Sequence, residues 1–301
     1  MSIIEIEHLT KDFGFGRGVF DVNLKVEKGE VYGFLGPNGA GKSTTIRHLM
    51  GFTKPGIGKV FVKGMDAWKD SSEVQKYVGY LPGEIALPEN LTGTQFINMM
   101  AELRGMKDMS HTEHLIEKIQ LEPSGSLKRM SLGMKRKLAV VTAFMHDPDI
   151  LILDEPTSGL DPIMQQVFID FIKEEKERGK TILLSSHIFS EIDATCDKIS
   201  MIKDGHVVSS FNADKLRHNE DKTFKIEFIN SENYHSFCEN IPEVLTLTED
   251  RVDQNQVIIN FKDSDVNTFI SYTSKFEMKF CSEIKFTLED YFMSFYGKGE
   301  K

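Results

Sequence analysis

The segment Gly36-Pro37-Asn38-Gly39-Ala40-Gly41-Lys42-Ser43 lies between an apolar run, 31–35, and a stretch with helical character, 43–50. It fits the pattern G-x-x-x-x-G-K-[ST], which requires a strand before it and a helix after it. The glycines let backbone N–H groups turn inward around phosphate oxygens, and the helix N-terminus adds the positive end of its dipole. The segment therefore predicts a phosphate-binding loop, which continues into Thr44.

Two side chains of this loop carry the expected chemistry. The ammonium of Lys42 would reach the β- and γ-phosphates, and the hydroxyl of Ser43 would bind Mg²⁺. The sequence thus predicts a nucleotide site that uses Mg²⁺.

A second element, Ile150-Leu151-Ile152-Leu153-Asp154-Glu155, places two acidic residues at the end of a buried strand. In open α/β sheets, ligands bind beyond the carboxyl ends of the strands. A strand ending in two acidic residues is common on its own, so the phosphate loop decides its interpretation. We expect Asp154 to hold Mg²⁺ and Glu155 to act as general base on an attacking water, a role worth about 10²–10⁴ in rate.

His187 follows the next predicted strand, 181–184, in Ser185-Ser186-His187. A lone histidine is more often structural than catalytic. Here the strand before His187 is expected to neighbour the strand that ends at Asp154, so the imidazole could reach the γ-phosphate. We predict a catalytic role for it.

Composition sets outer limits on the chain. Its 301 residues hold 36 Lys and Arg against 46 Asp and Glu, a net charge of −10, and three widely spaced cysteines. The length predicts two domains, and the cysteines suit a reducing compartment better than a disulfide framework. The acidic balance argues against general nucleic-acid binding. No apolar run approaches the roughly 18–20 residues that span a bilayer, and no secretory signal is expected.

The charge also suggests where the chain divides. Residues 219–301 hold 9 basic and 16 acidic side chains, a net of −7, and residues 1–218 the remaining −3. We therefore predict domains at 1–218 and 219–301.

Helical stretches alternate with buried strands in the first part, which predicts an α/β core with a mainly parallel sheet. Thr92 with Gln95 forms a capping-box pattern, Ser131 is expected to cap a helix, and Ile163, Val167 and Phe171 are expected to share one helix face.

In the second part the order β-α-β-β-α-β predicts a small ferredoxin-like α+β unit. Its ten phenylalanines are expected to form the core, and a role in regulation or dimer contact is the alternative.

Taken together, residues 3–210 resemble the ATPase subunits of ABC transporters. The decisive piece is Met130-Ser131-Leu132-Gly133-Met134-Lys135, which resembles the signature loop of that family. The resemblance implies a P-loop NTPase fold of the ABC ATPase type and two subunits that sandwich two ATP molecules head to tail. It implies that Ser131 and Gly133 contact the ATP of the partner subunit, that Phe13 stacks on adenine, and that Asp161 contributes to nucleotide binding.

Two departures from the family pattern stand out. Tyr80-Leu81-Pro82 is followed by Gly83-Glu84, where the family usually has glutamine at the first position. Either Glu84 takes over the contact with Mg²⁺ or the coupling differs. The signature loop also has Leu132 and Met134 in place of Gly and Gln. Such variants resemble the branch that powers ABC-2-type exporters of antibiotics, bacteriocins and peptides.

The resemblance further implies a helical subdomain, about residues 85–145, that receives the coupling helix of a membrane subunit. Phe96, Met99, Met100 and Leu103 would supply an apolar face there, and the alternative is a stripe packed on the subdomain's own core. The implied partners are a second ATPase subunit and a membrane permease, with no nucleic acid. The implied location is the cytoplasmic face of the cell membrane.

Two rival classes remain. A soluble ABC-type ATPase acting on nucleic acid or ribosomes usually has two fused nucleotide domains or basic extensions, which this acidic chain does not show. A P-loop kinase or GTPase would have no use for the signature loop.

The segment Thr287-Leu288-Glu289-Asp290-Tyr291-Phe292 resembles a helix that often ends subunits of the exporter branch.

Overall fold

The computed structural model describes residues 2–217 and 220–295 of the chain. They form two compact units, Met1–Ala213 and Asp214–Lys301. The predicted boundary between residues 218 and 219 lies outside the described residues.

The first unit contains two sheets. The smaller has the order β2-β1-β4-β5, and its neighbouring strands pair antiparallel. Its strands are β1 (Ser2–Asp12), β2 (Gly18–Glu27), β4 (Ile57–Val62) and β5 (Met65–Asp66). In β2, buried Val19, Val22, Leu24 and Val26 separate more exposed residues, because only one face of this sheet covers the core.

The larger sheet has the order β10-β9-β3-β8-β7-β6, parallel throughout except for the edge pair β9 and β10. Its strands are β3 (Val31–Leu35), β6 (Val78–Leu81), β7 (Ile150–Asp154), β8 (Thr181–Ser186), β9 (Lys198–Lys203) and β10 (His206–Asn212). Every residue of β3, β7 and β8 is buried, as expected for parallel strands covered on both faces. The predicted α/β core is confirmed.

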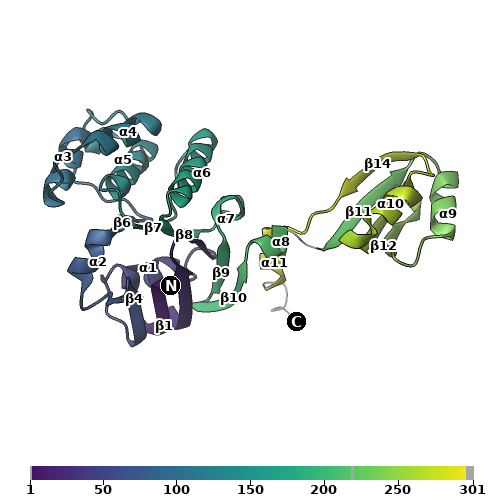
Figure 1. The fold of residues 1–301 in the computed structure, drawn as a ribbon, viewed down its shortest axis with the longest axis horizontal. Coiled ribbons are helices and arrows are strands. Elements are labelled where there is room, and N and C mark those ends of the chain that lie inside the picture. Colours follow the sequence, from purple (N-terminus) through teal and green to yellow (C-terminus); the bar gives the residue numbers. More distant parts are fainter. Residues whose placement is uncertain (1, 218–219, 296–301) are drawn as a thin grey trace. The chain divides into compact units, whose positions relative to one another are not determined.

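The helices of this unit are α1 (Lys42–Leu49), α2 (Ser71–Tyr77), α3 (Gly93–Leu103), α4 (Ser110–Lys118), α5 (Leu132–Phe144), α6 (Pro162–Glu177) and α7 (Phe189–Thr195). A short 3-10 helix, η1 (Leu127–Arg129), precedes α5. Helices α3, α4 and α5 pack together as a group (Figure 1). The predicted caps are present: Thr92 and Gln95 form the capping box of α3, and the Ser131 hydroxyl accepts from the Met134 N–H at the start of α5.

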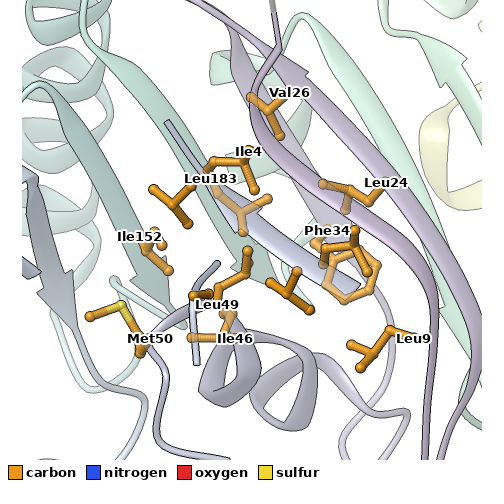
Figure 2. Close-up of a cluster of buried hydrophobic side chains, with 14 of the residues drawn as sticks. Ile4, Leu9, Leu24, Val26, Phe34, Ile46, Leu49, Met50, Ile152 and Leu183 are labelled. Atoms are coloured by element: carbon orange, nitrogen blue, oxygen red, sulfur yellow. The ribbon is translucent and has the colours of Figure 1, made fainter. Parts of the chain in front are cut away.

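The main core lies between the two sheets and around α1. Figure 2 shows Ile4 and Leu24 of the antiparallel sheet facing Phe34 and Leu183 of the parallel sheet, with Ile46 of α1 among them. Because α1 is buried along this face, its packing holds in place the end of the loop that leads into it from β3.

One predicted helix face is right for Phe171 but wrong for Ile163. The buried side of α6 is formed by Met164, Phe168, Phe171 and Ile172, whereas Ile163 is 77% exposed. The helix begins after Asp161, whose side chain accepts from the Met164 N–H, and carries more apolar residues than one stripe can bury. Packing against neighbours therefore decided which of them face the core.

The second unit has the strand order β12-β13-β11-β14, with all neighbours antiparallel. Its elements are α8 (Asp214–Arg217), β11 (Asp221–Phe228), α9 (Ser231–Glu239), β12 (Thr246–Arg251), η2 (Val252–Gln254), β13 (Gln256–Lys262), η3 (Asp263–Asp265), α10 (Val266–Thr273), β14 (Met278–Glu283) and α11 (Leu288–Ser294). The order between α8 and α11 is β-α-β-β-α-β.

Six of the ten phenylalanines of this second unit belong to its core cluster, and four do not. Phe228, Phe237, Phe261 and Phe269 are buried together. Phe280 and Phe286 are 38% and 46% exposed, and Phe292 and Phe295, in and after α11, are not part of this cluster. The expectation that all ten form the core is therefore wrong for these four. Phe280 lies on the edge strand β14, in which every residue after Met278 is exposed.

Within the described ranges 2–217 and 220–295, no helix is both long enough and apolar enough to cross a membrane.

Candidate nucleotide site

The phosphate loop occupies the turn between β3 and α1, as predicted. Gly39 and Gly41 have φ of 82° and 112°, values in the left-handed region that glycine adopts without strain. At Gly41 a Cβ would lie 2.8 Å from Val19 Cγ1. The loop is therefore closely packed at its helix end, and the bare backbone there is required by both conformation and space.

Lys42 is 5% exposed and points back into the loop. Its Nζ donates to the carbonyl of Gly36 at 2.6 Å and to that of Pro37 at 3.2 Å, and it lies 2.9 Å from Oε1 of Glu155. A cavity of about 160 Å³ opens at this point, lined by Pro37, Asn38, Gly39, Gly41, Lys42, Ser43, Thr44 and Glu155. The ammonium and the loop N–H groups are thus gathered around a space suited to phosphate oxygens.

The ends of two neighbouring strands place the acidic pair. Asp154 ends β7 opposite Ser185 of β8, and its Oδ1 accepts from the Ser185 hydroxyl. Asp154 is 2% exposed. Glu155 follows with φ of 49°, which costs a non-glycine residue about 1 kcal/mol, and its N–H donates to the Ser185 carbonyl at 3.0 Å. The backbone therefore turns sharply between the two carboxylates.

His187 lies one residue beyond β8, beside the strand that ends at Asp154, as predicted. Its Nδ1 is 2.7 Å from Oε2 of Glu155. Glu155 therefore lies between Lys42 and His187, with one carboxylate oxygen toward each. Three predicted catalytic residues from three separate segments are therefore in contact, and two of them, Lys42 and Glu155, line the cavity.

The other predicted site residues do not line this cavity. Phe13 is 57% exposed, in the turn between β1 and β2, and Glu84 is exposed after β6. Asp161 caps α6, and Ser131 caps α5 with Gly133 in its first turn. A Cβ on Gly133 would lie 3.3 Å from the Gly159 carbonyl, so the signature loop contacts the loop after Glu155 in its own subunit.

Sequence reasoning missed three buried polar residues behind the site: Ser185, Arg136 and Glu191. Glu191 is 2% exposed, and burial raises the pKa of its carboxyl to about 7, although hydrogen bonds from Ser186 and Thr157 lower it. The Ser186 hydroxyl donates to Oε2 of Glu191. No local pattern indicated the burial of Glu191, since α7 begins at Phe189 and Glu191 lies in its first turn. Arg136 shares the helical spacing of the buried Ala139 and Val140, which was the signal for its burial.

The family model described as ABC transporter matches residues 19–158. The bacitracin transport ATP-binding protein BcrA of Bacillus licheniformis is 36% identical over 219 residues, covering 72% of this chain and 72% of that protein. This chain belongs to the ABC transporter family of ATP-binding subunits. The resemblance inferred from residues 3–210 is confirmed.

Other members of the family agree with this assignment. The probable multidrug ABC transporter ATP-binding protein YbhF of Escherichia coli (strain K12) is 35% identical over 221 residues, 72% of this chain. The match spans only 38% of the length of YbhF. Among solved structures, one titled "Structure of ATP binding subunit of ABC transporter" superposes with a TM-score of 0.65 and 30% identity, covering 72% of this chain and 92% of that one. The predicted ABC ATPase fold is confirmed.

Proposed function

We propose that this chain is the ATP-hydrolysing subunit of an ABC exporter, which pairs with a second ATPase subunit and drives a separate membrane permease. The observation that carries the proposal is the contact of Glu155, which lines the phosphate-loop cavity, with Lys42 on one carboxylate oxygen and His187 on the other. The names of the relatives support the transport role, since BcrA is named for bacitracin and YbhF for multidrug transport.

The residues present fit ATP with Mg²⁺. The cavity is lined by the loop glycines and Lys42, and Gly39 has open space where a Cβ would lie, which leaves room for phosphate oxygens. The Asp154 carboxylate and the Ser43 hydroxyl are the hard oxygen donors that Mg²⁺ prefers, and they would hold it. When bound, the ion would neutralise charge that builds up on the β- and γ-phosphate oxygens.

Each side chain then has a task in hydrolysis. Lys42 binds the β- and γ-phosphates from within the loop. Glu155 accepts the proton of the attacking water at its carboxylate. His187, with Nδ1 against Glu155, orients that carboxylate and leaves Nε2 for the transferred phosphate. Ser131 and Gly133 serve the ATP of the opposite subunit, so a monomer would be nearly inactive.

A groove beside the helical group supports the permease as partner. It has a volume of about 890 Å³, and Met100, Leu103, Met106 and Met145 are among its lining residues. In α3 the core stripe is Ile97 and Ala101, which leaves Leu103 74% exposed. Burial lowers the pKa of His146 in this groove to about 4, so its imidazole is neutral near pH 7. The charged side chains Lys76, Arg104, Lys107, Asp108 and Asp147 also line the groove. Methionines beside charged groups suit an amphipathic helix, because methionine adapts to irregular apolar partners.

The test of hydrolysis is Glu155→Gln in the full chain. The variant should bind ATP as the native chain does, accumulate as an ATP-bound dimer in size-exclusion chromatography and lose at least about 10²-fold in turnover. Turnover unchanged from the native chain would exclude Glu155 as the base. The permease role is tested separately by fractionating the native host. Recovery with ribosomes or DNA in place of membranes would favour the soluble ABC-type ATPase.

A further inference from the structure

The guanidinium of Arg136 connects loops that meet at the nucleotide site. Arg136 lies in the second turn of α5 and is 2% exposed. Its Nη1 donates to the Pro82 carbonyl at 2.9 Å, its Nη2 to the Gly83 carbonyl at 2.7 Å and its Nε to the Ser158 carbonyl at 3.1 Å. Each of these three hydrogen bonds ends on a backbone oxygen of a loop.

Both loops lie beside the carboxylates of the site. A Cβ on Gly83 would be 3.1 Å from Oδ2 of Asp154, so the backbone of this loop packs directly against the predicted Mg²⁺ ligand. The Ser158 N–H donates to the Glu155 carbonyl at 3.2 Å, so the second loop begins at the general base. Displacing either loop would therefore move a wall of the site.

The same helix carries the signature loop at its N-terminus. Ser131 caps α5, and Arg136 follows within two helical turns on the same rigid element. A guanidinium offers a planar fork of donors that can hold carbonyls of two loops at once, which a lysine ammonium cannot reproduce. Because Gly83 has no side chain, its loop depends on backbone contacts, and Arg136 supplies two of them on successive carbonyls.

We propose that Arg136 is a positioning residue that ties the signature helix to the loops beside Asp154 and Glu155. Contact between the N-terminus of α5 and the ATP of the opposite subunit would then align the metal and base groups of the subunit that carries Arg136. The inference rests on the proposed function, since it assumes ATP hydrolysis in a dimer. It concerns turnover and not the binding of nucleotide to the phosphate loop.

The test compares Arg136→Met and Arg136→Lys with Lys137→Met in the full chain. Lys137 is the neighbouring basic residue of α5, and its Nζ donates to the Gln120 carbonyl, away from both loops. Steady-state ATP hydrolysis gives kcat and KM, titration with MgADP gives binding to the phosphate loop, and thermal melting sets a temperature at which every variant is folded.

We expect Arg136→Met to lower kcat at least about tenfold, since misplacing reacting groups by 1 Å costs about that much or more. Its Kd for MgADP should stay within about twofold of the native value, because Lys42 and the loop glycines are unchanged. Arg136→Lys should recover part of kcat through one carbonyl contact, and Lys137→Met should match the native chain. A merely structural role would lower the melting temperature without this split between kcat and ADP binding.

Two results would overturn the inference: a kcat for folded Arg136→Met equal to that of Lys137→Met, or a loss of MgADP affinity as large as the loss of kcat. The proposed function is checked on the Glu155→Gln chain with Arg136 intact. If that chain forms no dimer with ATP and the native chain hydrolyses none, the proposed function and the inference fall together. If it dimerises and the native chain hydrolyses ATP, a null result at Arg136 refutes the inference alone.

Discussion

The buried carboxyl of Glu191 should make the stability of the first unit depend on pH. Oε2 accepts from the Ser186 hydroxyl, and Oε1 has no hydrogen-bond partner in the part of the chain that the structure describes. Burial raises the pKa of this carboxyl from 4.5 to about 7. The perturbation is Glu191→Gln, which keeps an acceptor for Ser186 and removes the ionisation.

The sign and size of the effect follow from linkage. Because the folded pKa exceeds the unfolded one, the folded state holds the proton more tightly, and its stability falls as pH rises from 4.5 through about 7. The full shift corresponds to about 3 kcal/mol, since one pKa unit is about 1.4 kcal/mol. Roughly 1.4 kcal/mol of this is already lost at about pH 5.5, which leaves about 2 kcal/mol between about pH 5.5 and about pH 8.

The assay is urea unfolding of the full chain, followed by the fluorescence of Trp68. The chain has one tryptophan, and it lies in the first unit, so the signal reports that unit. From about pH 5.5 to about pH 8, the free energy of unfolding of Glu191→Gln should gain about 2 kcal/mol relative to the native chain. Glu177→Gln, at an exposed position of α6, is the matched control and should show no such change. An equal difference between Glu191→Gln and the native chain at both pH values would refute the reasoning.

Two further changes probe the site itself. Gly41→Ala should weaken MgADP binding at least about tenfold and destabilise the first unit by about 1–3 kcal/mol, because its φ is 112° and its Cβ would meet Val19 Cγ1. The control is Gly64→Ala, at φ of 77° with nothing within 4 Å of the added Cβ. It should lose stability only through backbone strain and should bind MgADP as the native chain does in the same titration. Ser185→Ala removes the hydroxyl that donates to Asp154 and should raise the Mg²⁺ concentration for half-maximal ATP hydrolysis about tenfold. An unchanged Mg²⁺ dependence in that variant would contradict the role given to Asp154.

Much of the candidate site is encoded in short contiguous segments, and for that reason it could be predicted. The chemistry of residues 36–43 depends on local backbone conformation and on one lysine, which a loop between a strand and a helix supplies by itself. Asp154 and Glu155 likewise follow an apolar run that can only be buried. The expected nearness of His187 followed from the general arrangement of parallel strands, since carboxyl ends of neighbouring strands lie at one edge.

The residues that sequence reasoning missed act across distance along the chain. Arg136 reaches carbonyls 53, 54 and 22 positions away, and no local pattern indicates which backbone atoms will face it. The burial of Glu191 depends on packing around α7 after β8, and that burial is the first cause of its raised pKa. The phase of α6 was predicted wrongly for the same reason, because neighbours selected Met164 and Phe168 over Ile163.

The sequence by itself therefore determined the nucleotide chemistry, the α/β class and the family, because these depend on contiguous motifs and on residue periodicity. The tertiary structure alone decided how the motifs are connected: Glu155 between Lys42 and His187, and Arg136 between the signature helix and two loops. Such connections arise only when strands from distant parts of the chain end side by side and exclude water. Once buried, polar side chains such as Arg136 hold the loops and carboxylates of the site in place through their hydrogen bonds and charges.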